Sequence, residues 1–486
     1  MHYFSLILSL FLLGCTSSPA SEPTVRLNIL WIVADDLGTD LGAYGDSLVH
    51  TPNLDRLAQQ GILYTNHYTV TAVCSPSRSA VITGMYPVSI GAHQHRTYYK
   101  DSLPDPVRPI TEYFHEAGYF VSNGSFQDRD KYGKTDYNFI HSNEDLYDGT
   151  DWRQRAEGQP FFAQVQIFYP HRPFLRDPSH PVDADQVKLP PYYPDHPIAR
   201  QDWALYLETV QYVDQEVGKV LQRLEDDGLA DNTIVFFFGD QGRPHVRAKQ
   251  FLYDPGTHTP LIIRRPASSG GQTDNQLVSN VDLAPTAMEL AGITVPDYMQ
   301  GQNFSESASP RDYVFTMRDR RDGTVDRIRA VRTKDYKYIR NFYPERAYTQ
   351  FNGYKKYRYP VLTLMQVMHK NGELTPAQAH FMADTRPAEE LYYLDDDPYE
   401  INNLADDPAD QDKLIELRQV LDEWLAEVDT ATYPEDSAAI AYAQQDMQRS
   451  FEERMKKYGL THEVSDEDYL RYWEGQLTPT LAKGDE

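Results

Sequence analysis

Apolar runs of strand length alternate with amphipathic stretches over the N-terminal part of the chain. Residues 27–34 form a continuous apolar run, which is typical of a strand buried on both faces of a parallel sheet. A helix is predicted to begin at Thr51, because Pro52 follows in the first turn and apolar residues recur three apart as far as Gly61. Further strands are predicted at residues 161–168, 233–238 and 260–263, and further helices at residues 110–117, 203–224 and 282–291. The alternation predicts an α/β fold with a large, mainly parallel central sheet flanked by helices, and with ligands beyond the carboxyl ends of its strands.

The pattern changes near Tyr313, where charged and tyrosine-rich alternation replaces the apolar runs. Residues 329–339 alternate between polar and apolar side chains, as antiparallel strands with one solvated face do. Residues 412–428 carry apolar side chains at helical spacing, so we expect this helix to pack on that sheet. From Tyr433 the chain is acidic and less patterned, and peripheral helices and loops are expected there. We therefore predict a large N-terminal domain over residues 27–312 and a smaller C-terminal subdomain with a peripheral tail over residues 313–486.

The N-terminus has the features of an export signal. Its apolar run, residues 3–14, is too short to span a bilayer but long enough for the apolar part of a signal peptide. Leu12, Leu13, Gly14 and Cys15 resemble a bacterial lipobox, which implies cleavage of residues 1–14, acylation of the Cys15 thiol and a tether over residues 15–26. This predicts an exported protein, in the periplasm or held at the outer membrane by a lipid anchor. A plain cleaved signal peptide is the alternative.

Composition narrows the class of partner. Acidic residues number 72 and basic residues 46, for a net charge of −26, so the chain as a whole repels nucleic acid and anionic membrane surfaces. An anionic partner therefore needs a locally positive pocket. Only Cys15 and Cys74 are present, and Cys15 is lost or acylated in either export route, so Cys74 has no disulfide partner in an oxidising compartment and calls for another explanation.

Carboxylates follow two of the predicted strands. Asp35 and Asp36 come directly after the first strand, and Asp240 follows residues 233–239. If both strands lie in one sheet, these carboxylates meet at the same edge, where their burial requires a neutralising cation. Gln241 adds an amide oxygen, and an all-oxygen set of this kind suits Ca²⁺.

Residues 74–84 keep the spacing C-x-P-x-R-x-x-x-x-T-G, from Cys74 through Arg78 to Gly84. This segment resembles the signature of type I sulfatases. The resemblance implies that a formylglycine-generating or anaerobic sulfatase-maturating enzyme oxidises Cys74 to formylglycine, whose hydrate is the nucleophile. It also implies that residue 74 gives an oxygen to the Ca²⁺ site, where Gln241 replaces the more usual Asn or His, and that Arg78 holds an ionised hydroxyl of the hydrate.

Further segments resemble motifs of the same family. Residues 133–136 match an element whose lysine, here Lys134, contacts formylglycine and sulfate. Residues 170–173 match an element whose histidine, here His171, protonates the leaving oxygen. Lys249 matches a lysine that bridges the sulfate and the leaving group. The family histidine that deprotonates the hydrate is replaced by Asp136. Either Asp136 is the second base or a nearby imidazole is, with His93 and His95 as the candidates.

The resemblance implies an alkaline-phosphatase-like fold with catalytic residues in segment 27–312. Residues 91–97 and 134–139 look like those of bacterial carbohydrate sulfatases related to N-sulfoglucosamine sulfohydrolases, and residues 391–404 are similar to the closing motif of the family. A sulfated carbohydrate substrate, for example of ulvan or glycosaminoglycan type, is therefore expected. Its binding is assigned to His93, His95, Arg96 and Arg318, although a solvated loop also explains the charged cluster 318–321.

Other functions remain open at this point. The same scaffold serves phosphodiesterases and phosphonate hydrolases, and the substrate can carry an N-sulfate in place of a sulfate ester. A non-catalytic, glycan-binding lipoprotein with an unmodified Cys74 is a third alternative. The presence of Asp35, Asp36, Asp240 and Arg78 argues against this third alternative, because a site without catalytic activity has little reason to keep these residues.

Overall fold

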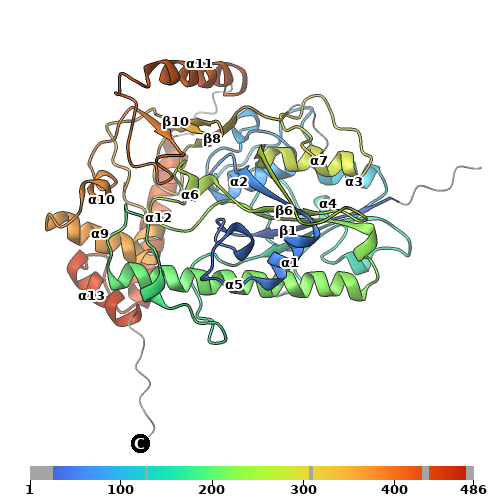
Figure 1. The fold of residues 1–486 in the computed structure, drawn as a ribbon, viewed down its shortest axis with the longest axis horizontal. Helices are drawn as coiled ribbons and strands as arrows, with labels where there is room; N and C mark the ends of the chain where they lie inside the picture. Colours follow the sequence, from blue (N-terminus) through green and yellow to red (C-terminus); the bar gives the residue numbers. More distant parts are fainter. Residues whose placement is uncertain (1–25, 126–127, 129, 306–309, 430–436, 478–486) are drawn as a thin grey trace, which may run out of the picture.

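The computed structural model describes residues 26–125, 128, 130–305, 310–429 and 437–477 of the chain, in which two sheets with their helices lie side by side (Figure 1). The predicted signal peptide and Cys15 lie outside the described residues. No helix in the described part of the chain has both the length and the apolar composition needed to cross a membrane.

The larger sheet has seven strands in the order β3-β4-β1-β5-β6-β2-β7. β1 pairs in parallel with β4 and with β5, and β3 extends the parallel half beyond β4. β6 runs antiparallel to both β5 and β2, and β2 pairs in parallel with β7. The strands are β1 Asn28–Ala34, β2 Ile62–Tyr68, β3 Phe120–Gly124, β4 Phe161–Ile167, β5 Thr233–Gly239, β6 Leu261–Arg264 and β7 Gln272–Ser279. The mainly parallel sheet predicted from the sequence is confirmed, with β6 as its antiparallel exception.

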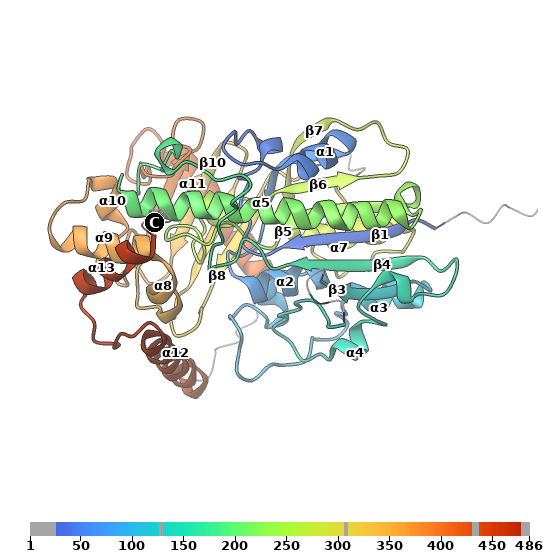
Figure 2. The same cartoon turned by 90° about the horizontal axis from the view of Figure 1, so that it is seen from below.

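Helices cover both faces of this sheet because β1 is apolar on both sides. Leu30 and Ile32 pack toward the face that carries α1 and α5, whereas Trp31 packs toward the face with α2, α3 and α7. Figure 2 shows α5 running along the whole sheet. It begins six residues before the predicted start, because His196 caps the helix and Pro197 occupies its first turn. These helices are α1 Pro52–Gln60, α2 Cys74–Thr83, α3 Ile110–Glu116, α5 Pro197–Asp226 and α7 Leu283–Leu290, with the short α4 Asn143–Leu146 and α6 Asp254–Thr257 between them.

The smaller sheet is antiparallel, in the order β11-β10-β9-β8. Helix α11 Gln411–Val428 lies on it and buries Leu417, Leu421 and Trp424 against Val331 and Tyr338 of the sheet. The strands are β8 Val314–Arg318, β9 Ile328–Arg332, β10 Tyr336–Asn341 and β11 Glu389–Tyr393. The predicted antiparallel sheet with a packed helix is confirmed, and with it the fold class.

Five further helices complete the described part of the chain. Three connect β10 to β11, namely α8 Gly353–Arg358, α9 Pro360–Lys370 and α10 Pro376–His380, and two follow α11, namely α12 Ser437–Lys457 and α13 Asp466–Leu477. α12 packs closely on α8, because Gly353 has no side chain and a Cβ at that position would come within 3.0 Å of the Met447 carbonyl oxygen. Phe351 and Phe451 make an edge-to-face contact at 5.4 Å beside it. The acidic and weakly patterned sequence gave no sign of this docking.

Candidate active site

The carboxyl ends of β1 and β5 bring Asp35, Asp36 and Asp240 together. Ala34 and Gly239 are neighbours across the two strands, so the residues that follow them leave the sheet at the same edge. The backbone N–H of Asp36 donates to Asp240 Oδ1 at 3.0 Å. All three side chains are buried, as the sequence pattern predicted.

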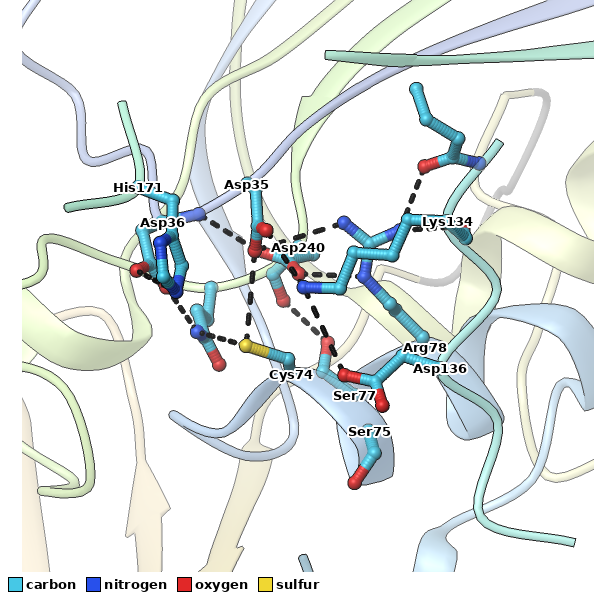
Figure 3. A network of polar contacts seen from close by, with 12 residues as sticks. Asp35, Asp36, Cys74, Ser75, Ser77, Arg78, Lys134, Asp136, His171 and Asp240 are labelled. Atoms are coloured by element: carbon cyan, nitrogen blue, oxygen red, sulfur yellow. Dashed lines mark hydrogen bonds and ion pairs between the residues drawn. The ribbon is translucent and has the colours of Figure 1, made fainter. Parts of the chain in front are cut away.

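Cys74 faces these carboxylates from the first turn of α2 (Figure 3). Its Sγ lies 3.8 Å from Asp35 Oδ1 and 3.0 Å from Gln241 Nε2. Ser77 holds the helix to the residues that follow β5 and β7. Its hydroxyl donates to the backbone carbonyl of Asp240 and accepts from Asn280 Nδ2 at 3.0 Å. The positive N-terminal end of α2 is therefore held against the acidic cluster.

Each of these carboxylates has a cationic partner. The pairs are Lys134 Nζ with Asp35 Oδ2 at 2.7 Å, Lys249 Nζ with Asp36 Oδ1 at 2.6 Å, and Arg78 Nε with Asp240 Oδ2 at 2.8 Å. The structure thus brings together the predicted nucleophile, metal ligands and cations, although they come from segments as far apart as residues 35 and 249.

Charge in this cluster is not fully balanced. Burial by itself would raise the pKa of Asp35, but the charges of Lys134, His171, Arg78 and Lys249 together outweigh burial and hold that pKa well below its usual value. Burial and the neighbouring charge of Asp35 raise the pKa of Asp240 to about 7, in spite of its contact with Arg78. Asp240 therefore gives up part of its charge near neutral pH unless a further cation is present.

The donor set fits a hard divalent cation. Ligand atoms of Asp35, Asp36 and Cys74 lie within 4.8 Å of one another, and Asp240 adjoins them. Gln241 Oε1 is buried and has no hydrogen-bond partner among the described residues, so an amide oxygen is available beside the carboxylates. Oxygen donors in this number are those that Ca²⁺ prefers.

The unmodified thiol is a weak nucleophile in this setting. Burial raises the pKa of Cys74 to about 11, against the opposing charges of Lys134 and Lys249. A thiol with this pKa is almost wholly protonated at neutral pH. As an unmodified thiol, Cys74 is therefore poorly suited to nucleophilic attack at neutral pH.

His171 faces Asp36 from the loop after β4. Its Nδ1 contacts the Arg172 carbonyl oxygen at 2.8 Å, which leaves Nε2 directed at the cluster, 3.8 Å from Asp36 Oδ2 and 3.4 Å from the Tyr354 hydroxyl. Burial lowers the pKa of His171, against the opposing charge of Asp36. The imidazole is thereby placed to exchange a proton through Nε2.

Asp136 is held away from proton transfer by Arg96. The guanidinium donates to both carboxylate oxygens at 2.9 Å, while Lys134 Nζ lies 3.8 Å away. Burial would raise the pKa of Asp136, but the hydrogen bonds and charge of Arg96, together with the charges of Lys134 and His95, outweigh burial and keep that pKa well below its ordinary value. A carboxylate in this state is a weak base.

His95 forms a dyad with Asp322 in the wall of the cavity described below. Its Nδ1 lies 2.9 Å from Asp322 Oδ1, and its Nε2 is buried with no hydrogen-bond partner among the described residues. Burial lowers the pKa of His95 to about 4, against the charge of Asp322. Asp36, Arg96, Asp136 and Asp322 all have positive φ angles, of 63°, 47°, 53° and 49°, so strained backbone is concentrated at this site.

A cavity of about 530 Å³ opens onto Cys74. Five residues that the sequence assigned to the site line it: His95, Arg96, Lys134, His171 and Lys249. His93 and Arg318 lie outside its lining: Arg318 is buried over the Phe251 ring and lies 3.4 Å from Asp326. Arg320 and Arg321 of the charged cluster 318–321, two and three residues beyond Arg318, also line the cavity. The sequence did not assign to the site the other lining residues Tyr354, Tyr357 and Arg358 of α8, and Tyr442, Met447 and Arg454 of α12.

Comparison with protein families agrees with this geometry. Residues 27–293 match the sulfatase family, and residues 244–360 match the C-terminal region of N-sulphoglucosamine sulphohydrolase. The chain is 37% identical to an ulvan-active sulfatase of Formosa agariphila, over 84% of this chain and 76% of that protein. It is 27% identical to the human N-sulphoglucosamine sulphohydrolase, over 82% of this chain and 89% of that one.

Solved structures share the fold at low sequence identity. A protein solved in complex with its substrate D-glucosamine-2-N,6-O-disulfate superposes with a TM-score of 0.62 at 21% identity, over 85% of this chain and 100% of that one. The phosphonate monoester hydrolase of Agrobacterium radiobacter superposes with a TM-score of 0.61 at 19% identity, over 83% and 96%. The resemblance to type I sulfatases and, among them, to N-sulfoglucosamine sulfohydrolases is confirmed by the family matches. The chain belongs to the sulfatase family and is a sulfate ester hydrolase.

Proposed function

We propose that this sulfatase removes sulfate from a sulfated carbohydrate of ulvan or glycosaminoglycan type, with a formylglycine at position 74 as its nucleophile. The observation that carries the proposal is the position of Cys74, buried at the start of α2 among Asp35, Lys134 and Lys249 and open to a cavity large enough for a sugar. Relatives that act on ulvan and on N-sulphoglucosamine support the substrate class.

The unmodified thiol of Cys74 is a poor nucleophile. Its oxidation by a maturation enzyme supplies a better one. The hydrated aldehyde offers one hydroxyl to attack sulfur and a second whose deprotonation later expels sulfate and restores the aldehyde. The raised pKa of the unmodified thiol, about 11, supports this modification. Arg78, one helical turn after Cys74 and already bonded to Asp240, is positioned to stabilise negative charge on the hydrate.

Asp35, Asp36, Asp240 and Gln241 would hold Ca²⁺, whose Lewis acidity lowers the cost of charge on the sulfuryl oxygens. Lys134 and Lys249 flank the same position and add positive charge. His171 gives the proton on Nε2 to the sugar oxygen as the S–O bond breaks, while the Arg172 carbonyl holds its Nδ1.

This role predicts that the loss of activity in a His171→Ala variant depends on the leaving group of the substrate. Hydrolysis of a sugar sulfate, whose alkoxide needs a proton, should fall by about 10²- to 10⁴-fold. Hydrolysis of 4-nitrophenyl sulfate should fall by roughly tenfold or less, because the phenolate leaves without one. Steady-state kcat values on both substrates measure the difference; an equal loss on both would assign His171 to binding rather than proton transfer.

For the second step we propose His95 as the base, in preference to Asp136. Asp322 orients the imidazole through Nδ1 and leaves Nε2 without a partner, whereas Arg96 occupies both oxygens of Asp136. With a pKa lowered to about 4, His95 is in its neutral, basic form above that pH, so the step slows as the pH falls through about 4. The position in the cavity wall supports this assignment.

A His95→Asn variant should therefore stall after the first step. Turnover should fall by about 10²-fold or more, and the peptide that contains residue 74 should gain the mass of one sulfate group during turnover. Mass spectrometry of quenched reactions detects the gain. Asp136→Asn is the matched comparison and should accumulate none; accumulation in Asp136→Asn alone would make that carboxylate the base.

The proposed function is tested with the protein produced together with a formylglycine-generating enzyme. A panel of sulfated mono- and oligosaccharides, including ulvan and glycosaminoglycan fragments with O- and N-sulfate, is assayed for inorganic sulfate beside matched phosphate esters. Release from one sugar class names the substrate. Faster release of phosphate than of sulfate would favour a phosphonate- or phosphodiesterase activity on this scaffold.

We also propose export, with Cys15 acylated and the catalytic part in the periplasm or at the outer membrane. The lipobox-like residues 12–15 support this. Labelled palmitate should be incorporated into the wild-type chain but not into Cys15→Ala. Absence of label from both proteins would indicate an ordinary cleaved signal peptide instead of a lipid anchor.

A further inference from the structure

The lining of the cavity includes cationic side chains that have no role in the proposed removal of one sulfate group. Five of its other cations are neutralised within the protein: Lys134 by Asp35, Lys249 by Asp36, Arg96 by Asp136, Arg172 by Asp202 and Arg321 by Asp322. Arg358 and Arg454 also line the cavity, and neither has a carboxylate partner among the residues that the structure describes. In a chain of net charge −26, two uncompensated guanidinium groups on one wall are unusual.

Both guanidinium groups lie against the ring of Tyr357. The distances from the guanidinium carbon to the ring centroid are 5.3 Å for Arg358 and 5.7 Å for Arg454, within the range of cation–π contacts. The three side chains are half-buried and form a cluster, which we call the Arg358–Tyr357–Arg454 cluster. The acid of this wall, Asp446, is engaged by Arg449 rather than by the cluster.

The cluster lies on the leaving-group side of the reaction centre. Tyr357 contacts the ring of Tyr354 at 5.8 Å, and the Tyr354 hydroxyl lies 3.4 Å from His171 Nε2, the atom proposed to protonate the sugar oxygen. The carbonyl oxygen of Arg358 accepts a hydrogen bond of 3.0 Å from Arg172, the residue after His171. A sugar whose oxygen reaches His171 therefore extends toward Tyr357.

Helix α12 holds Arg454 in this position. The helix packs over Gly353, and Gln444 Nε2 donates to the Gly323 carbonyl at 3.4 Å. Phe451, one turn before Arg454, is buried. The second cation of the cluster thus belongs to a docked helix and is partly ordered before any ligand binds, which lowers the entropic cost of binding.

We infer that the Arg358–Tyr357–Arg454 cluster binds a second anionic group of the substrate, on the leaving-group side of the sulfate that is removed. Paired guanidinium groups recognise carboxylate and sulfate oxygens through charge-assisted hydrogen bonds. The ligand is accordingly a uronic acid carboxylate or a second sulfate, on the sulfated sugar or its neighbour. This inference rests on the proposed function and narrows its substrate class to polyanionic oligosaccharides.

Three sulfated disaccharides that differ in one group test the inference: one with a neutral neighbouring sugar, one with a uronate and one with a second sulfate. The wild-type enzyme should have a kcat/KM about 10- to 100-fold higher for an anionic disaccharide than for the neutral one, mainly through KM. Whichever anionic disaccharide is preferred identifies the group. In Arg358→Gln and Arg454→Gln the preference should shrink to a few-fold, and Arg454→Lys should retain part of it.

Lys457→Gln is the matched control, because it removes one positive charge from the same helix at an exposed position outside the lining of the cavity. Its preference should equal that of the wild type, and the thermal unfolding midpoint of every variant should stay near the wild-type value. Equal kcat/KM for all disaccharides, or an unchanged preference in Arg358→Gln and Arg454→Gln, would overturn the inference. Failure of wild type to release sulfate from any of the three would instead count against the proposed function.

Discussion

A Cys74→Ala variant should lose sulfatase activity by at least about 10⁴-fold on every substrate, the largest effect expected of any single substitution in this enzyme. Alanine has no sulfur to oxidise, so neither the nucleophile nor the hydroxyl that expels sulfate can form. The other groups at the site, including Lys134, Lys249 and His171, remain in place but have no attacking atom to assist. Release of inorganic sulfate under single-turnover conditions measures the loss.

Ca²⁺ binding by the Cys74→Ala variant is the control for this prediction. The carboxylates of Asp35, Asp36 and Asp240 do not depend on residue 74 for their position, because backbone at the ends of β1 and β5 places them. Cys74→Ala should therefore still bind Ca²⁺ in a calorimetric titration. Wild-type protein made with the maturation enzyme should carry an aldehyde at position 74, and activity that persists in Cys74→Ala would remove residue 74 from the mechanism.

The second large effect is expected for Asp35→Asn, which should lose both Ca²⁺ affinity and about 10³-fold or more of the activity. Asp35 is fully buried, contacts Lys134 at 2.7 Å and is the acid nearest Cys74 Sγ. An amide offers a weaker, uncharged ligand and leaves Lys134 without its partner. Calorimetric titration with Ca²⁺ and sulfate release before and after treatment with a chelator measure the two losses.

Asp214→Asn is the matched control for this prediction. Asp214 is also buried, on α5, but it lies outside the lining of the cavity. Its carboxylate oxygens accept from the Leu54 backbone N–H and from Asn53 Nδ2, so Asp214→Asn gives up one of these hydrogen bonds without touching the metal site. This variant should bind Ca²⁺ and turn over like the wild type. Chelator treatment should silence wild type and Asp214→Asn alike, and Ca²⁺ should restore both; full activity of the chelated wild type would exclude a metal requirement.

Local features of the sequence predicted much of the reaction centre. Asp35 and Asp240 follow apolar runs that form adjacent strands, and the motif from Cys74 to Gly84 lies on one helix, so short-range spacing located them. The strands β2, β3 and β7 were not predicted. β7, for instance, has polar side chains through most of its length because it is an edge strand, and it therefore has no continuous apolar signal.

The substrate side of the cavity was harder to predict, because its residues meet only through tertiary contacts. His95 and Asp322 are 227 residues apart, and neither lies in an apolar pattern that marks a partner. Arg318 was assigned to substrate binding from the same charged cluster as Arg320 and Arg321, but it lies at the end of β8, outside the lining of the cavity, whereas the two later arginines line it. Which member of a charged run faces a cavity depends on where the strand ends.

The amino-acid sequence by itself determined the α/β class, the strands at the centre of the sheet, the cysteine helix and the acidic residues at the strand ends, because each is encoded in hydrophobic periodicity or in fixed spacing over a few residues. Only the tertiary structure decided that α12 forms a wall of the cavity, that Asp322 orients His95 and that Arg358 and Arg454 share the ring of Tyr357. Those contacts join distant segments, and their energy comes from the packing of the completed fold rather than from any local pattern.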